Sequence, residues 1–533
     1  MASEASSQWE EFYFGSRRFQ PMADYLGMPI DQVNFILGQL MALVLAYVMR
    51  VYCHPSQVST STRHYCSFLT GLGISYFCFG RQVVLAVLLV LGCYLLMLLL
   101  PLTLLHHVTL AASLTFLSVM HIQRQFYEDG LFVIDVTGPL MIIVQKATSL
   151  AYSLHDGLSG LKDEELTPLQ RELVLRKRPT VIEYFSYMLN FHSMLAGPFF
   201  MFADYQDFIE GTHYAKRALG TSSPMVSLDS NSNKSPAEVK PESEGEVGHK
   251  TSQVTHPRKE PNPTRVSLYK ASLAAICAFV TVMILPKFRI SFITEPSYFT
   301  SSWSYKVFFI LAVTSCTRHV YYTGWLLGDS ICNMSGMGFN GYNRDGTPRW
   351  DLVSNVDVAS VETSLSLRDT LEAWNSGTMK WLRFMVYERA GEQKTLLTYM
   401  LSSLWHGFYP GYYITFVSGA FFTIVARYVR RSVRPQVLKF GPGVKKGYDL
   451  LTCLSSRLIL AYFTFPFIHL RFWGSIAVYR DMYFFPVIIG VLLIVVLPIV
   501  LPPPQRSHQT KVTIPTSFDT GHVADEKLDK KVQ

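Results

Sequence analysis

One histidine in the last third of the chain stands in a strongly apolar and aromatic setting. His406 lies in the stretch SSLWHGFYPGYYITF, residues 402–416, shortly before Pro410-Gly411. An imidazole can take up a proton near pH 7, and ionisable side chains inside a membrane are often functional. A buried histidine whose ring nitrogens are satisfied by its neighbours explains the same pattern. The residues around His406 leave both interpretations open.

Five other histidines in or near apolar segments compete for such a role. One of them, His155, is followed by Asp156-Gly157, whose carboxylate is in a position to orient the ring. Periodicity alone does not choose between these side chains. The five are His121, His155, His192, His319 and His469.

Two predicted helices position His406. A mostly apolar helix over residues 395–409 carries it and is broken by Pro410-Gly411. Upstream, Asp369 is the predicted N-cap of a single amphipathic helix that continues to residue 390 and lies at the membrane interface. Asn375 borders the apolar stripe of that helix, and a turn near residues 391–392 brings the two helices together.

Composition places these helices in a membrane. The 533-residue chain is 49% hydrophobic and 16% charged, whereas soluble domains carry about 25% charged residues. Residues 82–123 contain no Asp, Glu, Lys or Arg, and residues 482–504 form a second such run. Runs of about 20 apolar residues are long enough to span a bilayer as helices. We therefore predict an all-α, polytopic membrane protein with about 11 membrane-embedded helices, some re-entrant or tilted, around a central reaction chamber.

Polar residues inside these segments indicate that the bundle has a polar interior. Asp135, Gln145 and Lys146 interrupt an otherwise apolar stretch, and such side chains persist at membrane depth only when protein or a cavity surrounds them. Basic connections at 162–178 and 427–446 are predicted to lie on the cytosolic side. No internal repeat of the kind found in transporter halves is evident.

Polarity divides the chain into two sets of membrane helices joined and flanked by polar segments. The polar segments are too poor in large apolar residues to form a core. Lys530 and Lys531 near the C-terminus resemble a di-lysine retrieval signal of the endoplasmic reticulum, and a solvated basic end explains them equally well. The predicted parts are a polar N-terminus at 1–30, N-terminal membrane helices at 31–210, a disordered loop at 211–265, C-terminal membrane helices with Asn375 and His406 at 266–504, and a disordered cytosolic tail at 505–533.

Cysteine usage and charge exclude several other classes of protein. The eight cysteines are scattered and include no C-x-x-C pair, which argues against a disulfide framework and against a zinc site. The net charge of +8 is spread over loops and tails rather than gathered in one patch. Nucleic-acid binding is therefore the weaker explanation of the basic character.

The stretch WHGFYPGYYITF resembles the W-H-G-x-x-P-G-Y-x-x-x-F motif of the membrane-bound O-acyltransferase family, in its lysophospholipid acyltransferase branch. Trp374-Asn375 is similar to that family's W-N, and Trp350-Asp351 to its W-D. The similarity includes GPLMIIVQKATSLAYSLHDG and GMGFNGY and covers nearly the whole chain apart from the polar loop and the tails. One departure is TRHVYYTGW, where relatives usually have Pro-Lys at the positions of His319-Val320.

Within the branch, the chain looks most similar to acyltransferases that act on lysophosphatidylethanolamine and lysophosphatidylserine. The resemblance implies transfer of a long-chain, unsaturated acyl group from acyl-CoA to the free hydroxyl of a lysophospholipid. This reaction is a step of phospholipid remodelling, the Lands cycle, in the endoplasmic reticulum membrane. Acyl-CoA is then a co-substrate, and no metal or prosthetic group is implied. The oligomeric state is left open.

The resemblance assigns catalysis to His406 and a supporting role to Asn375. A base must take the hydroxyl proton as the oxygen attacks the thioester carbonyl, and burial keeps an imidazole neutral and able to accept. Asn375 can fix the imidazole tautomer or donate to the oxygen on which negative charge develops. Direct attack by the lysolipid is favoured, while Ser402 or Ser403 as the nucleophile of an acyl-enzyme is the alternative.

Further candidates surround this pair, and each has an ordinary explanation as well. Aromatic residues can line an acyl tunnel or simply pack, and basic residues can bind CoA phosphates or only set membrane topology. The candidate substrate-binding residues are Trp374, Trp405, Tyr409, Tyr412, Glu362 and Ser402, and the candidate CoA phosphate contacts are Lys380, Arg383, Arg427 and Arg431.

Two other functions are compatible with a multi-pass membrane protein of this kind. One is a transporter or channel that uses the polar interior as a pathway. The other is an acyltransferase of the same fold whose acceptor is a protein or a sterol. Loss of acyl transfer in a His406→Ala variant separates the enzyme from the transporter, and a panel of acceptors separates the two enzymes.

Overall fold

The computed structural model describes residues 13–128, 134–218 and 260–502. These residues form helices joined by short connections, and β-structure among them is limited to two isolated bridges, Tyr342–Pro348 and Val356–Trp374. The all-α prediction is thus confirmed.

In the N-terminal set, the α-helices from α3 to α7 are long, and those after α7 are short. Its members are α2 (Gln20–Leu26), α3 (Ile30–Tyr52), α4 (Thr60–Phe79), η1 (Gly80–Gln82), α5 (Val83–Leu99), α6 (Leu102–Glu128), α7 (Thr137–Leu158), η2 (Asp163–Glu165), α8 (Pro168–Leu173), α9 (Val181–Leu189), α10 (Phe202–Glu210) and α11 (His213–Ala218).

The C-terminal set contains α14, whose 33 residues make it the longest helix described. The set is α12 (Thr264–Phe279), η3 (Val280–Ile284), η4 (Leu285–Lys287), η5 (Ile290–Thr294), α13 (Pro296–Thr300), α14 (Trp303–Ser335), α15 (Val358–Thr363), α16 (Leu367–Ala373), α17 (Ser376–Leu382), η6 (Arg383–Tyr387), α18 (Lys394–His406), α19 (Pro410–Val437), η7 (Leu438–Phe440), α20 (Pro442–His469), α21 (Phe472–Asp481) and α22 (Phe485–Val500).

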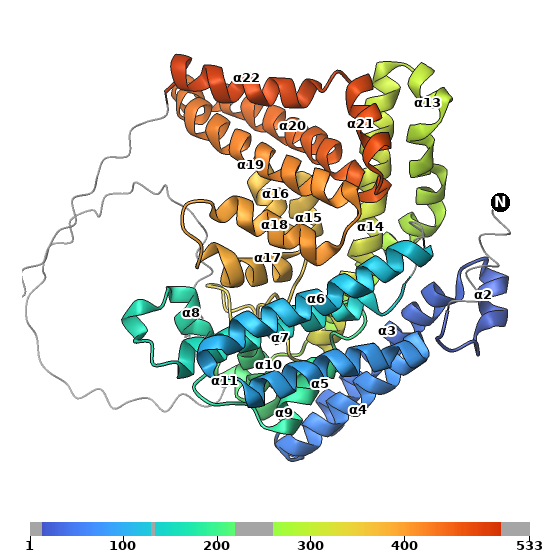
Figure 1. Ribbon diagram of the computed structural model, residues 1–533, viewed down its shortest axis with the longest axis vertical. Coiled ribbons are helices and arrows are strands. Elements are labelled where there is room, and N and C mark those ends of the chain that lie inside the picture. Colours follow the sequence, from blue (N-terminus) through green and yellow to red (C-terminus); the bar gives the residue numbers. More distant parts are fainter. Residues whose placement is uncertain (1–12, 129–133, 219–259, 503–533) are drawn as a thin grey trace, which may run out of the picture.

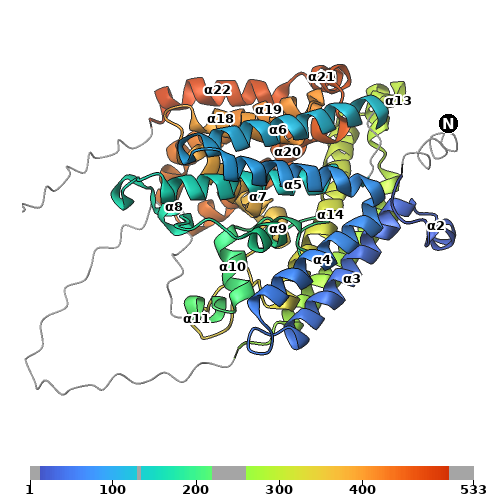
Figure 2. The ribbon, with the colours of Figure 1, turned by 60° about the horizontal axis from the view of Figure 1, so that its bottom comes forward.

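Helices α3, α4 and α5 lie on one side of the molecule, and α19, α20 and α22 lie on the opposite side (Figure 1). Between them are α6, α7, α17 and α18. Helix α14 packs against α3, α12 and α20, and so joins the two sides. Figure 2, turned by 60°, shows the same layers, with α6 and α5 passing in front of the C-terminal helices. The helices that carry His406 and Asn375 are therefore central.

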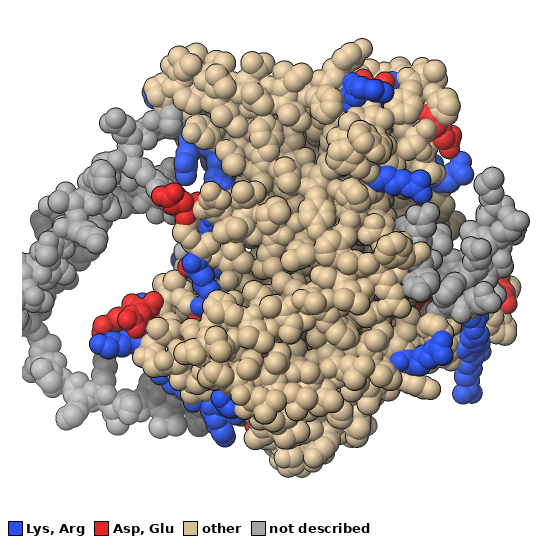
Figure 3. Space-filling model, viewed as in Figure 1, with Lys and Arg blue, Asp and Glu red and all other residues tan. Residues whose placement is uncertain are grey.

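Within the described residues, six helical stretches are long and apolar enough to cross a membrane, or seven if α21 and α22, bent by 72°, form one span. One face of the molecule is almost free of charged side chains between its left and right edges, where Lys and Arg gather (Figure 3). A polytopic membrane protein is thus confirmed. The number of about 11 membrane-embedded helices stays a prediction. Helices α9 and α18 are too short to cross a bilayer, and α7 is buried inside the protein.

The polar interior that the sequence predicts is found around α7. Gln145 and Lys146 are completely buried in this helix. The Lys146 ammonium donates to Tyr187 O (2.9 Å) and to the hydroxyl of Ser193, and it lies 4.7 Å from the centre of the Phe200 ring. Gln145 Nε2 donates to Thr378 Oγ1 of α17 (2.8 Å), so polar contacts in the interior reach the helix that follows Asn375.

Both ends of the range 211–265, which the sequence predicts to be a disordered loop, belong to helices or helix ends in the structure. Residues 211–218 end α10 and form α11, and α12 begins at Thr264, so the two ends of that range are ordered helices. Gly211 closes α10 with a φ of 79°, and its backbone N–H bonds to the last carbonyls of the helix. The rest of the predicted loop, 219–259, lies outside the described residues, as do 1–12 and the tail from 503 with Lys530 and Lys531.

Candidate active site

His406 is the last residue of α18, and the helix ends there because of the next residue. Gly407 has a φ of 115°, a region that favours glycine and cannot continue a right-handed helix. Pro410 is the first residue of α19, where its fixed φ and missing N–H suit a helix start. The predicted helix over 395–409 is therefore too long at its C-terminus, since Gly407 ends α18 before Pro410 starts α19.

The His406 ring is surrounded by aromatic rings. Its centroid lies 5.2 Å from that of Phe416, 5.1 Å from that of Phe467 and 5.9 Å from that of Tyr412. Among the described residues, neither ring nitrogen has a hydrogen-bond partner, and the side chain is only partly buried. A ring nitrogen is thus left to accept a proton from a hydroxyl group.

Trp405 is buried and anchored to the N-terminal set of helices. Its indole Nε1 donates to Met141 O of α7 (3.0 Å), and its ring lies 5.8 Å from that of Trp381. Trp381 in turn donates from its own Nε1 to Thr148 Oγ1 of α7 (2.9 Å). The sequence suggested Trp405 as a substrate-binding residue, and in the structure its side chain is enclosed between α7, α17 and α18.

The single helix predicted from Asp369 to residue 390 is wrong. Helix α16 has Ser366 as its N-cap, whose Oγ accepts from Asp369 N (3.2 Å), and ends before Trp374. Asn375 then adopts φ 49° and ψ 49°, and α17 starts anew at Ser376. Asparagine tolerates this left-handed conformation better than most residues. Asn375 therefore lies at the break between two helices and not on the stripe of one.

Backbone pairing with an earlier segment produces this break. Trp374 forms an antiparallel bridge with Val356, and Ser376 N donates to Asn355 O (2.9 Å). Gly377 N donates to Asn355 Oδ1 (3.0 Å). These bonds satisfy the first N–H groups of α17, which have no partner within the helix. The tertiary contacts, rather than local helix propensity, decide the backbone at Asn375.

An ion-paired cluster fixes the segment that pairs with Trp374-Asn375. Lys270 Nζ of α12 lies 2.7 Å from Asp329 Oδ2 of α14 and 2.9 Å from Trp350 O. Ser354 Oγ donates to the same Asp329 oxygen (2.7 Å). Asp329 is almost completely buried, so its charge depends on these partners. The segment around residues 350–355 is in this way fastened to α12 and α14.

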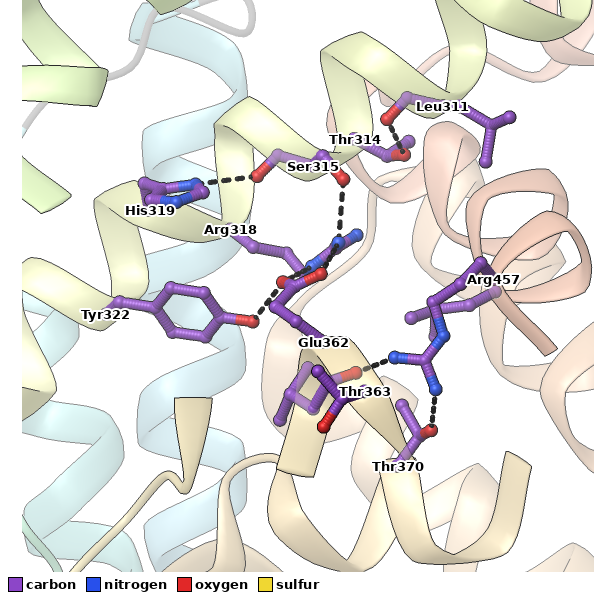
Figure 4. A network of polar contacts seen from close by, with 12 residues as sticks. Leu311, Thr314, Ser315, Arg318, His319, Tyr322, Glu362, Thr363, Thr370 and Arg457 are labelled. Carbon is purple, nitrogen blue, oxygen red and sulfur yellow. Dashed lines mark hydrogen bonds and ion pairs between the residues drawn. The ribbon is translucent and has the colours of Figure 1, made fainter. Parts of the chain in front are cut away.

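Glu362 belongs to a second polar network, shown in Figure 4. Its carboxylate accepts from Arg318 Nε (2.9 Å) and Nη2 (2.7 Å) and from the Tyr322 hydroxyl (2.7 Å). Burial raises the pKa of Glu362, but the hydrogen bonds and positive charge of Arg318 outweigh it and hold the pKa below its ordinary value. Glu362, suggested by the sequence as a substrate-binding residue, thus has its carboxylate engaged by protein partners.

The Glu362 network extends to the helices on both sides. Arg457 of α20 donates to Thr370 Oγ1 (Figure 4). It also donates to Ser364 O (3.0 Å) and contacts Val361 O. The Tyr322 ring lies 5.7 Å from that of Trp374. The network therefore joins α14, α15, α16 and α20 next to the residue that precedes Asn375.

The helical hairpin formed by α17, η6 and α18 brings Asn375 and His406 to the same end. The first arm covers residues 376–387 and the second 394–406, so the arms are almost equal in length, and they pack against each other. In such a hairpin the start of one arm lies at the same end as the finish of the other. Aromatic rings pack around the residue before Asn375: the Tyr321 ring lies 5.8 Å from that of Trp374.

The remaining candidate substrate-binding residues differ in where their side chains lie relative to His406. The Tyr412 ring, which lies beside His406, is 4.5 Å from that of Phe467 and 5.7 Å from that of Tyr409. Ser402 and Ser403 are buried in α18, and Ser403 Oγ donates to Met400 O of its own helix (2.8 Å). The hydroxyl of Ser403 is in this way engaged within α18.

The four basic residues suggested for CoA phosphates are distant from His406 in the sequence. Their side chains have different surroundings. Lys380 is 4.0 Å from Asp204, and Arg383 Nε donates to Glu388 (2.7 Å). Arg427 Nε donates to Thr423 O at 3.4 Å, and Arg431 is exposed. Their role toward CoA stays a prediction.

Of the five competing histidines, one reaches the His406 turn: His121 Nε2 lies 3.1 Å from Trp405 O. The others are engaged or enclosed elsewhere. His155 lies 3.4 Å from Asp156 and its ring 3.8 Å from that of His106, His192 is buried against Phe191, His319 contacts Ser315 O of its own helix, and His469 contacts Ser475 Oγ.

Sequence reasoning missed Phe467 and Tyr321 as neighbours of the candidate site. Both lie in helices that are distant from residues 402–416 along the chain, and no short motif marks them. Only the packing of α20 against α19, and of α14 against α20, brings them close.

Residues 122–465 match the model of MBOAT, the membrane-bound O-acyltransferase family. This range includes both Asn375 and His406. The chain belongs to this family. It is an O-acyltransferase of the multi-pass membrane type, and the resemblance read from the W-H-G motif is confirmed.

Relatives of this acyltransferase carry consistent names. It is 41% identical over 488 residues to Lysophospholipid acyltransferase 6 of Drosophila melanogaster, covering 91% of this chain and 64% of that protein, so it spans just under two thirds of that relative's length. It is 34% identical over 507 residues to Membrane-bound glycerophospholipid O-acyltransferase 1 of Mus musculus, covering 95% and 97%. It is also 32% identical over 389 residues to Lysophospholipid acyltransferase of Schizosaccharomyces pombe, covering 71% and 69%.

Proposed function

We propose that this acyltransferase transfers a long-chain, unsaturated acyl group from acyl-CoA to the free hydroxyl of a lysophospholipid in the endoplasmic reticulum membrane. Lysophosphatidylethanolamine and lysophosphatidylserine are the favoured acceptors. The names of relatives from insect, mouse and yeast support a lysophospholipid or glycerophospholipid substrate. The observation that carries the proposal is His406, whose ring nitrogens have no partner among the described residues, at the same hairpin end as Asn375.

In the proposed reaction His406 acts as general base. Its ring takes the proton of the lysolipid hydroxyl while the hydroxyl oxygen attacks the thioester carbonyl. The tetrahedral intermediate then collapses, the C–S bond breaks, and the imidazolium returns the proton to the CoA sulfur. The products are a diacyl phospholipid and CoA with a free thiol, and the histidine is again neutral.

Asn375 supports the reaction as a hydrogen-bond donor. Its amide is neutral, which suits an interior where an uncompensated charge is costly. The left-handed conformation of Asn375 and the bond from Gly377 N to Asn355 Oδ1 fix the backbone that carries this amide. A pre-organised donor at the developing oxyanion is worth about 10²–10³ in kcat.

The aromatic surroundings of His406 fit the apolar part of both substrates. Phe416, Phe467 and Tyr412 cover part of the imidazole and offer flat apolar surface to an acyl chain, which would complete the exclusion of water. Water in the same place would hydrolyse the thioester, so its exclusion favours transfer to the lipid hydroxyl.

The test uses isolated membranes with labelled acyl-CoA and a panel of lysophospholipids, a sterol and an acceptor peptide. Wild type is compared with His406→Ala, Asn375→Ala and His469→Gln, the last being a control histidine outside the hairpin. We expect phospholipid product from wild type and the control, and none above background from His406→Ala. Transfer that survives His406→Ala contradicts the mechanism, and transfer only to the sterol or peptide contradicts the substrate class.

A further inference from the structure

His121 of α6 supports the turn that carries His406, although it is 285 residues earlier in the chain. Its imidazole is buried, and its Nε2 lies 3.1 Å from the carbonyl oxygen of Trp405. A carbonyl oxygen only accepts hydrogen bonds, so Nε2 carries the hydrogen and donates it. The last carbonyls of a helix lack partners within the helix, and His121 supplies one for the residue directly before His406.

The same imidazole also lies against the residue directly after His406. A Cβ atom added to Gly407 would stand 3.1 Å from His121 Cγ and 3.3 Å from Nδ1. These distances leave no free space for a side chain there, and the φ of 115° disfavours one as well. His121 thus contacts both neighbours of His406 from one side.

Trp405 is held from a second direction by α7. The indole donates to Met141 O, while the Trp405 carbonyl accepts from His121. Helices α6 and α7 pack along each other, and α6 also contacts α18. In Figures 1 and 2 α6 lies alongside the central helices in both views. Trp405, directly before His406, is therefore fixed to α6 through its backbone carbonyl and to α7 through its indole.

These contacts replace a feature that a catalytic histidine commonly has. Such a ring is usually oriented by a carboxylate or carbonyl bonded to its second nitrogen. Among the described residues His406 has no such partner, and the rings of Phe416 and Phe467 contribute packing to it. The direction of the His406 ring then depends on its backbone and on the surrounding rings.

We propose that His121 is a positioning residue, which sets the orientation of His406 by donating to the Trp405 carbonyl and by packing on Gly407. The inference rests on the proposed function, because it needs His406 to be the base. It assigns His121 no proton transfer and no contact with substrate. A misplacement of about 1 Å at a reacting group can cost roughly 10²-fold in rate, so loss of this contact should lower kcat and leave KM nearly unchanged.

The experiment measures kcat and KM for acyl-CoA and lysophospholipid with the purified full chain in detergent–lipid micelles. His121→Phe keeps a ring but has no donor, His121→Met is a second donorless variant in case the first does not fold, and His121→Gln restores an N–H donor. The control His64→Phe makes the same change at another buried histidine, whose Nδ1 lies 2.6 Å from Ser186 Oγ between α4 and α9. Activity is normalised to the amount of monodisperse protein in each preparation.

We expect the donorless His121 variants to lose roughly 10- to 100-fold in kcat, with KM for both substrates within about twofold of wild type. His121→Gln should recover most of the loss, and His64→Phe should keep wild-type kcat. Unchanged kcat in His121→Phe or Met, or no recovery in His121→Gln, overturns the inference while His406→Ala remains inactive. Full activity of His406→Ala instead overturns the proposed function, and this inference with it.

Discussion

His406 and Asn375 reach the same end of one helical hairpin, but the contacts that fix them differ in chemistry. The turn at His406 is held by neutral hydrogen bonds, from His121 to Trp405 O and from the Trp405 indole to Met141 O. The break at Asn375 is held by a segment that is fastened through charged groups, among them the pairs Lys270–Asp329 and Arg318–Glu362.

Because of this difference, we expect substitutions on the two sides to affect stability and catalysis to different extents. Removing one neutral hydrogen bond costs about 0.5–1.5 kcal/mol of stability, whereas leaving one partner of a buried ion pair alone costs about 3–5 kcal/mol. The Asn375 side is therefore expected to fail by unfolding locally, and the His406 side by losing catalytic geometry in a folded protein. Substitutions on the two sides should be distinguishable by whether stability or kcat changes first.

The largest effect is expected when the two side chains themselves are removed. His406→Ala should lower kcat by about 10²–10⁴-fold, the range for a general base. Asn375→Gly should lower it by about 10²–10³-fold, while the glycine keeps the left-handed backbone that α17 needs. Initial rates with labelled acyl-CoA measure both. An Asn375→Gly variant with wild-type kcat would show that only the backbone matters at this position.

The next largest effect concerns the charged cluster on the Asn375 side. Asp329→Asn leaves the Lys270 ammonium without its carboxylate and should destabilise the protein by about 3–5 kcal/mol. The double variant Lys270→Met with Asp329→Asn removes the unpaired charge and should be more stable than the single one. Thermal midpoints by size-exclusion chromatography of the detergent-solubilised protein measure this. If the double variant is the less stable of the two, the ion pair is not what fastens this side.

Much of the fold was predictable from the sequence because hydropathy reports on spans directly. The long apolar stretches that become α3, α5, α6, α19 and α20 could be recognised without any tertiary information. Helices α7 and α14 are harder, because buried polar residues such as Lys146 and Asp329 lower their hydropathy while the protein interior satisfies them. The number of embedded helices therefore does not follow from hydropathy.

The candidate site was predictable only where local pattern decides the structure. The motif identified His406 and Asn375, but the helix across Asn375 was predicted as continuous, because its break depends on pairing with residues 355–356, about twenty positions earlier. His121 was one of five competing histidines, and nothing local marked it out. Its contact with Trp405 O spans 284 positions and exists only after α6 packs against α18.

A smaller effect is expected at Glu362, and it depends on pH. The pKa of Glu362 is lower in the folded protein than its ordinary value of 4.5, so the carboxylate stabilises the fold at all pH values above 4.5. This contribution is lost as the pH falls from 4.5 through the folded pKa. The difference in unfolding midpoint between wild type and Glu362→Gln should be constant from pH 6 to 8 and shrink below pH 4.5. A difference that grows on acidification contradicts the assigned pairing with Arg318.

The smallest effect is expected from two matched deletions of a single hydrogen bond, one on each side. Trp405→Phe removes the indole N–H to Met141 O, and Tyr322→Phe removes the hydroxyl that donates to Glu362, while both keep an aromatic ring. Trp405→Phe should cost about 0.5–1.5 kcal/mol of stability, and Tyr322→Phe about 1.5–3 kcal/mol, because its hydroxyl donates to a charged carboxylate. Because Trp405 adjoins His406, whereas Tyr322 contacts Trp374, His319 and Glu362, kcat should fall several-fold more in Trp405→Phe than in Tyr322→Phe. Equal kcat in the two variants would mean that the two sides position their residues in the same way, and the contrast between them would not hold.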